Sequence, residues 1–210
     1  MPRKPQQQRA KATVESIIEA GFICLAKHGI EGTTTRHIAD VAGIGVGSLY
    51  EYFANKQEVM DAMYQMVVAD VVAMIQPLTP RLVKMDIREA VRTLLYEFRE
   101  LLMRDDGRYL KYAGQAVNIA HRDNLEPINK ILMDLVVQYV MHHPEVMKMQ
   151  NIPVMSYIVI NGGMFSVIRH LGEASPMITF DQLAEGLVDM VGHIVDGEMG
   201  KAEAALSLKA

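Results

Sequence analysis

The sequence predicts an all-α fold of about nine helices joined by short links. Three observations support this prediction. Apolar residues recur at steps of three and four along most of the chain, no β-rich segment is present, and capping residues precede the periodic stretches. Half of the 210 residues are apolar and 22% are charged, so the chain can bury a sizeable core and global disorder is not expected.

The N-terminal part of the chain should contain three helices. The first carries apolar residues at helical spacing from Val14 and should end at Gly29, a plausible C′ residue. A short second helix should follow the N-cap Thr34 and stop at Gly43. The third is expected over residues 46–53, and together these helices form a domain over residues 1–55.

A fourth helix should begin after Asn55, with Glu58 as its capping-box partner. We expect it to run to about Gln76, because Pro77 and Pro80 interrupt a helix. Its residues are apolar on nearly every side, which is typical of an enclosed helix. It is therefore expected to contact both parts of the protein and to open a second domain, residues 56–210.

Five further helices are expected in the second domain. They cover residues 86–102, about 107–121, about 124–142, about 154–171, and a last stretch that begins at Thr179 with Gln182 as capping partner. The apolar run over residues 152–168 is interrupted by Pro153, Ser156, Asn161 and two glycines, so a buried core helix is favoured over a membrane span.

Charge is unevenly distributed although the net charge is −4. Residues 1–59 carry seven Lys and Arg against six Asp and Glu, whereas the remainder carries fourteen against nineteen. A basic tip on an acidic body is compatible with nucleic-acid binding. The polar N-terminus contains no apolar segment of the secretory type, so we expect a cytoplasmic protein that does not associate with membranes.

Catalytic, metal and cofactor sites are not expected. The chain has no GxSxG or HExxH motif and no paired-carboxylate motif, and Cys24 is its single cysteine. His142 and His143 are adjacent, so on a helix they point about 100° apart and do not share a metal-binding face. The sequence therefore favours a protein that is not an enzyme and that uses no cofactor and no metal.

The segment AGIGVGSLYEYFANK, residues 42–56, permits two interpretations. A glycine-rich loop can hold a nucleotide phosphate, but such a loop follows a strand, and a P-loop ends in Lys followed by Ser or Thr. Here a helix precedes the glycines and the lysine is missing. The alternative is a helix-turn-helix, in which Gly43 forms the turn, while Gly45 and Gly47 permit close approach to DNA.

The segment TTTRHIADVAGIGVGSLYEYFANKQEVMDAM, preceded by LAKHGIEG, resembles the N-terminal domain of TetR-type bacterial repressors. The resemblance covers about residues 10–63, where Thr34-Thr35, Ile38-Ala39, Ala42-Gly43, Leu49-Tyr50, Phe53 and Lys56 have the family's spacing. One departure is Gly45, where the family often has a serine. Gly in place of a Ser cap costs only a few tenths of a kcal/mol.

The resemblance implies a set of DNA-contacting residues. These are Thr34, Thr35, Arg36, Gly45, Val46, Gly47, Ser48, Tyr50, Tyr52 and Lys56. Arg36 is equally well suited to a bidentate guanine contact and to a phosphate contact. Tyr50, Tyr52 and Lys56 would bind phosphates.

The C-terminal helices are apolar enough to need a second partner surface, and the family pairs its last two large helices in a homodimer. Residues expected in this interface are Met155, Ile158, Gly162, Phe165, Leu183, Leu187, Met190 and Ile194. A ligand cavity could be lined by Met63, Val67, Val71, Phe98, Tyr109, Tyr112, Asn118 and Tyr139. Arg169 could bind an anionic effector group, although an Arg at the solvated end of its helix is the more common situation.

Together these features predict a homodimeric repressor that leaves a palindromic operator in double-stranded DNA when a small, largely apolar effector binds. Two alternatives remain open. The first is a DNA-binding regulator or activator that responds to no ligand, and the second is an enzyme on a helical scaffold.

Overall fold

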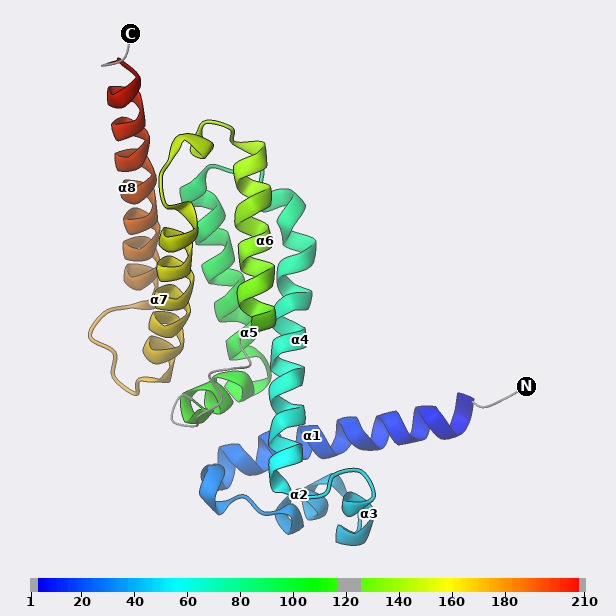
Figure 1. Ribbon diagram of the computed structural model, residues 1–210. Coiled ribbons are helices and arrows are strands. Elements are labelled where there is room, and N and C mark those ends of the chain that lie inside the picture. Colours follow the sequence, from blue (N-terminus) through cyan, green and yellow to red (C-terminus); the bar gives the residue numbers. More distant parts are fainter. Residues whose placement is uncertain (1–3, 117–125, 208–210) are drawn as a thin grey trace. The chain divides into compact units, whose positions relative to one another are not determined.

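The computed structural model describes residues 4–116 and 126–207, and every regular element in these two stretches is helical (Figure 1). The elements are α1 (Lys4–Gly32), α2 (Thr35–Ala42), α3 (Val46–Tyr50), α4 (Lys56–Leu82), α5 (Ile87–Ala116), α6 (Glu126–His142), the 3-10 helix η2 (Val146–Lys148), α7 (Ile152–Gly172) and α8 (Phe180–Ser207). The predicted all-α class is confirmed. The described part contains eight labelled α-helices against about nine expected. The helices expected over residues 86–102 and from about residue 107 are both parts of α5, which four non-helical residues divide.

The chain divides into two compact units. Unit 1 comprises residues 1–70 and 103–120, and unit 2 comprises residues 71–102 and 121–210. The division therefore falls within α4 and again within α5, whereas the sequence suggested a boundary at the start of α4.

Unit 1 is built around the contact between α1 and the first half of α4. Ile17 and Leu25 of α1 and Val59 and Met63 of α4 are all 0% exposed. Gly21 lies between these helices, and a Cβ at this position would be 2.6 Å from Met63 Sδ. The helices approach closely because Gly21 has no side chain.

Residues 104–107 interrupt α5. Asp105, Asp106 and Gly107 have φ angles of 50°, 59° and 67°, and Arg104 before them has extended backbone geometry. Asp is one of the few residues with a side chain that enter the left-handed region with any frequency. The break that the sequence predicted near Gly107 is confirmed.

The part of α5 after this break packs within unit 1. The Tyr109 side chain is 0% exposed, and its hydroxyl donates a hydrogen bond to Asp70 Oδ2 at 2.6 Å. Arg108 forms an ion pair with Glu19 of α1. Burial, reinforced by the hydrogen bond to Asp70, raises the pKa of Tyr109 to about 12, so the phenol stays neutral and donates at physiological pH.

The expected end of α4 near Gln76 is wrong. The helix continues through Pro77 and Pro80 to Leu82. Each proline lacks an N–H group and leaves one carbonyl, those of Ala73 and Gln76, without its helical partner. Both residues are exposed, so water can satisfy these carbonyls and the helix tolerates the two prolines.

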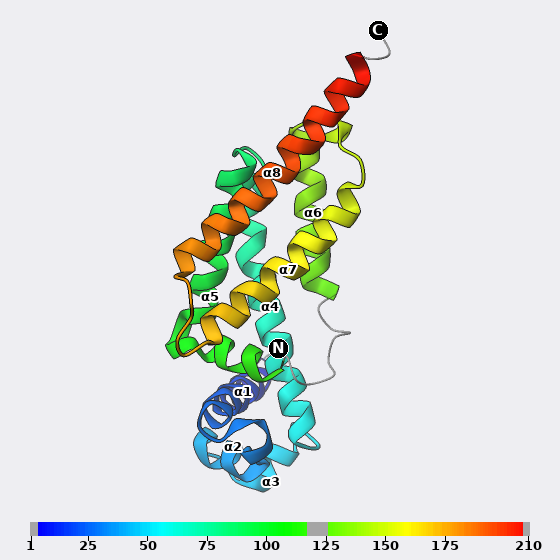
Figure 2. The same cartoon turned by 90° about the vertical axis from the view of Figure 1, so that its left-hand side faces the viewer.

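Unit 2 has two layers, with the end of α4, the first part of α5 and α6 in one layer and α7 and α8 in the other (Figures 1 and 2). Polar pairs link α5 to α8. Arg92 binds Glu185 through two hydrogen bonds of 2.7 and 2.6 Å, and the Tyr96 hydroxyl donates to Asp181 at 2.6 Å. These pairs are four residues apart on both helices, so they fix the register of the two helices.

A third pair, Arg88 with Asp196 at 2.7 Å, continues the same row of polar contacts. The guanidinium of Arg88 crosses Gly192 of α8, where an added Cβ would lie 2.3 Å from Arg88 Cζ. A side chain at position 192 would therefore displace the Arg88 guanidinium from this position.

Apolar side chains remain exposed on α7. Val154, Tyr157, Ile158 and Phe165 are 58%, 66%, 62% and 52% exposed. By length and composition, α7 is the one described helix that could cross a membrane, and only 6% of its eighteen-residue apolar window is buried. The expectation of a buried core helix is therefore wrong for the single chain, because α7 covers unit 2 with one face only.

Candidate DNA-binding surface and ligand cavity

The turn between α2 and α3 is a helix-turn-helix turn. Thr34 caps α2, with its hydroxyl accepting a hydrogen bond from the His37 backbone N–H at 3.2 Å. Gly43 adopts the left-handed conformation, with φ 69° and ψ 28°, and the Ile44 N–H returns to the Ala39 carbonyl at 3.0 Å. The left-handed Gly43 and the Ile44 hydrogen bond end α2 and turn the chain towards α3, as the sequence predicted.

The third helix is anchored on one side only. Leu49 is 0% and Phe53 is 7% exposed, and Ile38 of α2 lies in the same core at 0%. Ser48 is exposed and Val46 is half-buried. The anchored face therefore leaves the start of α3 open to an external partner.

Neither steric crowding nor backbone conformation requires glycine at positions 45 and 47. An added Cβ at either position would meet no atom within 4 Å, and neither residue has a positive φ. Gly45 is the N-cap of α3, a position where glycine is tolerated. The open space at both positions is compatible with the close approach of an external molecule that the helix-turn-helix interpretation predicts.

The residues predicted to bind phosphate differ in their solvent exposure and in their hydrogen-bond partners. Tyr50 and Tyr52 are 51% and 37% exposed, and the Tyr50 hydroxyl shares a hydrogen bond of 3.1 Å with Thr35 Oγ1 at the start of α2. Lys56 is half-buried, and its Nζ donates to the Ile30 carbonyl at 3.0 Å. The Lys56 ammonium has two further N–H groups, so a phosphate contact remains a prediction.

Arg36 is exposed on the first turn of α2. Next to it, His37 stacks on His28 of α1, with ring centroids 4.6 Å apart and the planes 24° from parallel. The sequence did not reveal this stack, because the two histidines lie in different helices and at no recognisable motif spacing. The stack joins α1 to the helix that carries Thr35 and Arg36.

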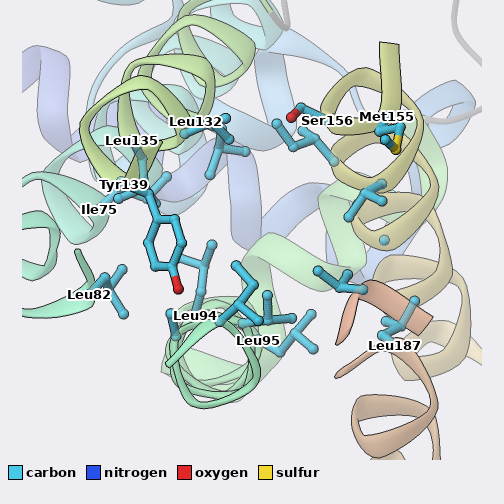
Figure 3. A pocket seen from close by; sticks show the side chains of 18 of the residues that line it. Ile75, Leu82, Leu94, Leu95, Leu132, Leu135, Tyr139, Met155, Ser156 and Leu187 are labelled. Atoms are coloured by element: carbon cyan, nitrogen blue, oxygen red, sulfur yellow. The ribbon is translucent and has the colours of Figure 1, made fainter. Parts of the chain in front are cut away.

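Unit 2 encloses an apolar cavity of about 240 Å³ (Figure 3). Its walls come from α4, α5, α6, α7, α8 and η2. Among the lining residues are Val71, Ile75, Leu82, Leu94, Leu95, Phe98, Leu132, Leu135, Tyr139, Met155, Ser156, Gly163 and Leu187. Figure 3 shows Leu94 and Leu95 on one side of the hollow and Met155 and Ser156 of α7 on another.

Three of the predicted ligand-binding residues, Val71, Phe98 and Tyr139, line this cavity. Four others, Met63, Val67, Tyr109 and Tyr112, belong to unit 1 and do not line it. Met63 packs against Gly21, and the Tyr112 hydroxyl donates to the Met60 carbonyl at 3.4 Å. None of these four is therefore part of this cavity. Met63 and Val67 precede the division of α4 after residue 70, and the left-handed residues of α5 precede Tyr109 and Tyr112, which pack in unit 1.

Two predicted residues lie elsewhere. Arg169 is an exposed residue of α7 that pairs with Glu173 at 3.2 Å and does not line the cavity. Asn118 lies outside the described residues.

The sequence also missed most of the wall contributed by α6 and α7. Leu132, Leu135 and Tyr139 recur at helical spacing, which could have indicated one wall of α6. Met155, Ser156 and Gly163 could not be separated from the outer face of α7, because apolar residues occur on both faces of that helix.

The residues predicted for a dimer interface fall into two groups. Met155, Leu187 and Ile194 line the cavity instead. Ile158, Gly162, Phe165 and Met190 are exposed, and Leu183 is half-buried. The second group forms what we call the α7–α8 face.

Metal chemistry finds no support in the described part of the chain, where no group of three or more His, Cys, Asp and Glu side chains is arranged to hold a metal ion.

Residues 17–63 match the family described as bacterial regulatory proteins, tetR family. The HTH-type transcriptional repressor KstR2 of Mycobacterium tuberculosis is 45% identical over 47 residues, which are 22% of this chain and 24% of the relative. The match thus spans about a quarter of that relative's length.

Solved structures extend the likeness to the whole fold. A TetR-family transcriptional regulator from Mesorhizobium loti aligns with a TM-score of 0.67 at 15% identity, over 91% of this chain and 97% of that one. The fatty acid degradation regulator FadR from Bacillus halodurans aligns with a TM-score of 0.65 at 16% identity, over 93% and 96%. At these identities the likeness concerns the fold.

Replacing Gly47 with Glu tests the DNA-binding surface. The side chain has room, so the melting temperature should not fall, but a carboxylate at the start of α3 should weaken DNA binding more than about tenfold by charge repulsion. The measurement is a titration with a duplex selected by the wild-type protein from a random pool.

The control is Gly197→Glu, which adds the same charge at an α8 position where an added Cβ also meets no atom within 4 Å. Equal affinity of Gly47→Glu and Gly197→Glu for the duplex would contradict the assignment.

Proposed function

We propose that this chain, a TetR-type DNA-binding transcriptional regulator, is a homodimeric cytoplasmic repressor that a small apolar ligand releases from a palindromic operator. The observation that carries the ligand part of the proposal is the apolar cavity of unit 2. The ligand-independent regulator remains the second candidate.

Support for DNA binding comes from the geometry of α2 and α3. A capped α2, a left-handed Gly43 and two glycines without internal steric cause present the start of α3 to a partner. Arg36 is exposed beside it, where it can contact either a guanine or a phosphate. Two copies related by a two-fold axis would read two half-sites about one helical turn or more apart, hence a palindromic operator.

Support for an effector comes from the cavity lining. Ligand sites are mostly apolar concave spaces with a few polar groups, and the lining described above fits this pattern. Met74, Met149, Met155 and Met164 are among the lining residues. Methionine side chains adapt their shape easily, so the cavity can accept ligands of more than one shape.

Support for dimerisation comes from the α7–α8 face. Ile158 and Phe165 leave more than half of their surface exposed, and an exposed apolar patch of this kind marks an interaction site. Gly162 is exposed, with open space at its Cβ position, so another helix can approach closely there. We assign this face to a second copy rather than to a membrane, because α8, which contributes Met190 to the face, carries the exposed carboxylate of Asp189 next to it.

Coupling between ligand and DNA is proposed to pass along α4. This helix contributes Lys56 to unit 1, and it contributes Val71, Met74 and Ile75 to the cavity wall in unit 2. A ligand that displaces this wall changes the free energy of the DNA-bound arrangement. It can release the operator only by as much as its affinities for the two arrangements differ.

Charging the α7–α8 face tests the dimer. Phe165→Glu should convert the dimer into a monomer, because two carboxylates would be buried in an apolar interface. Sedimentation velocity at micromolar concentration measures the effect. Val137→Glu is the matched control, since Val137 of α6 is 55% exposed and is not part of the face. A monomeric wild-type protein, or a Phe165→Glu variant that remains dimeric, would contradict the proposed interface.

Filling the cavity tests the effector site. Gly163 is buried and lines the cavity, and an added Cβ there meets no atom within 4 Å. In Gly163→Leu the new side chain should occupy the hollow, and the helix gains about 0.8 kcal/mol of propensity. We expect wild-type DNA affinity together with loss of release by any apolar ligand that acts on the wild-type protein.

The readout is fluorescence anisotropy of the bound duplex during ligand titration, starting from decanol. The control is Gly172→Leu, which adds the same side chain at an exposed position of the same helix that belongs neither to the cavity lining nor to the α7–α8 face, and should keep the ligand response. Release of Gly163→Leu by the same ligand concentration as the wild type would exclude this cavity. A ligand-independent regulator would show no release in either protein.

A further inference from the structure

We propose that the unit 2 cavity selects uncharged apolar molecules and discriminates against carboxylates, such as fatty acids, because the polar pocket that adjoins it at Tyr139 is acidic. The inference rests on the proposed effector role of the cavity and adds the chemical class of the ligand.

The cavity itself offers nothing to balance a charge. Among the 29 described residues that line it, none is Asp, Glu, Lys, Arg or His, and only Tyr139 and Ser156 carry a side-chain hydroxyl. An ion transferred into such surroundings loses its hydration without gaining a partner, at a large cost in free energy. The part of the ligand that lies within the cavity is therefore uncharged.

The two hydroxyls define what polar group the cavity can accept. The Tyr139 hydroxyl donates to the Met85 carbonyl at 3.2 Å, so towards a ligand it can only accept. Ser156 Oγ has no hydrogen-bond partner in the described part of the chain and can donate or accept. A ligand hydroxyl suits both groups, whereas a carboxylate would receive at most the one donor of Ser156.

A second pocket lies next to the cavity, and Ile87, Tyr139, Val146 and Val195 line both. We call it the acidic pocket. Its charged and titratable lining residues are Asp86, His143, Glu145 and Asp196, and no Lys or Arg is among its described lining residues. The two pockets meet at Tyr139, so a ligand head group on that side of the cavity lies close to the acidic pocket.

The basic groups near the acidic pocket are already paired with its carboxylates. Arg88 binds Asp196 at 2.7 Å, and His143 Nδ1 lies 3.2 Å from Glu145. The other ring nitrogen of His143 faces the Val83 carbonyl at 3.1 Å. Asp86 accepts the Arg88 backbone N–H at 2.8 Å. The hydrogen bond to Asp196 and, to a smaller extent, the charge of Asp86 raise the pKa of the Arg88 guanidinium.

The negative charge extends to the boundary between the two pockets. Burial, and after it the charges of Asp86 and Glu145, raise the pKa of Tyr139 to about 12. The same charges would act on a head group at this position. Lys148 also lies near Glu145, where it contributes to lowering the pKa of that carboxyl, but it does not line the pocket.

Three probes, decanol, decylammonium and decanoate, have alkyl chains of the same length and differ in the charge of the head group. Their affinities therefore separate the contribution of charge from that of apolar surface. Calorimetric titration of the full chain at neutral pH, below micelle formation, should rank decanol tightest and decanoate weakest. The affinity for decylammonium should exceed that for decanoate by about tenfold or more. The reason is that the carboxylate of decanoate is repelled by the carboxylates of the acidic pocket when they are a few ångströms apart.

The double variant Asp86→Asn with Glu145→Gln tests the origin of this ranking. Asn keeps the capping oxygen at the start of α5, so the fold should be retained. The difference between decylammonium and decanoate should shrink to within about threefold, while decanol affinity stays unchanged. The control is Asp134→Asn with Glu173→Gln, which removes two charges from exposed positions that line neither pocket and should keep the wild-type ranking.

The outcomes distinguish the inference from the proposed function. Equal binding of decanoate and decanol by the wild type, or the same ranking in both double variants, overturns the inference and leaves the effector cavity in place. Failure of all three probes to bind, or unchanged binding of decanol by Gly163→Leu, overturns the effector cavity and the inference with it.

Discussion

Unit 2 buries apolar surface incompletely, and this constraint explains both of its proposed roles. Inside, six elements enclose a cavity whose lining is almost entirely apolar. Outside, Ile158 and Phe165 of α7 leave apolar surface in water. Removal of apolar surface from water is favourable roughly in proportion to its area. The cavity and the exposed face of α7 therefore both favour the binding of another molecule. A ligand completes the interior, and a second copy completes the exterior.

Unit 1 depends on a different constraint, the positions where a side chain is missing. Gly21 is required inside the protein, because α1 and α4 leave no room for a Cβ beside Met63. Gly43 is required by its left-handed backbone. Gly45 and Gly47 meet neither requirement, and this contrast directs attention to an external partner at the start of α3. Gly21 and Gly43 are thus explained by the fold, whereas Gly45 and Gly47 are explained by the proposed contact with DNA.

Much of this organisation was accessible from the sequence because it is encoded locally. The cap at Thr34, the stop at Gly43 and the capping box of Thr179 and Gln182 depend on neighbouring residues, and the structure confirms each of them. Leu49 and Phe53, which have the family's spacing in the sequence, are four residues apart and both buried, because amphipathic spacing defines the inner face of a short helix.

The cavity could not be predicted to the same extent, because its composition depends on long-range packing. Tyr109 and Tyr112 have the semi-polar character of ligand-binding residues, yet three left-handed residues before them place both in unit 1. Met155 and Leu187 were expected at a dimer interface because their helices are apolar on more than one face. Only the packing of α7 and α8 on unit 2 shows which face is turned inward.

The central claim is that occupancy of the cavity and binding of DNA are coupled. Thermodynamic linkage makes this coupling reciprocal. The most direct measurement is therefore the affinity of the cavity for one uncharged ligand, determined with and without a saturating operator duplex. We predict that the duplex weakens ligand binding by the factor by which the ligand weakens duplex binding, about 5- to 150-fold for a coupling of 1–3 kcal/mol. Equal ligand affinities in the two titrations would contradict the account.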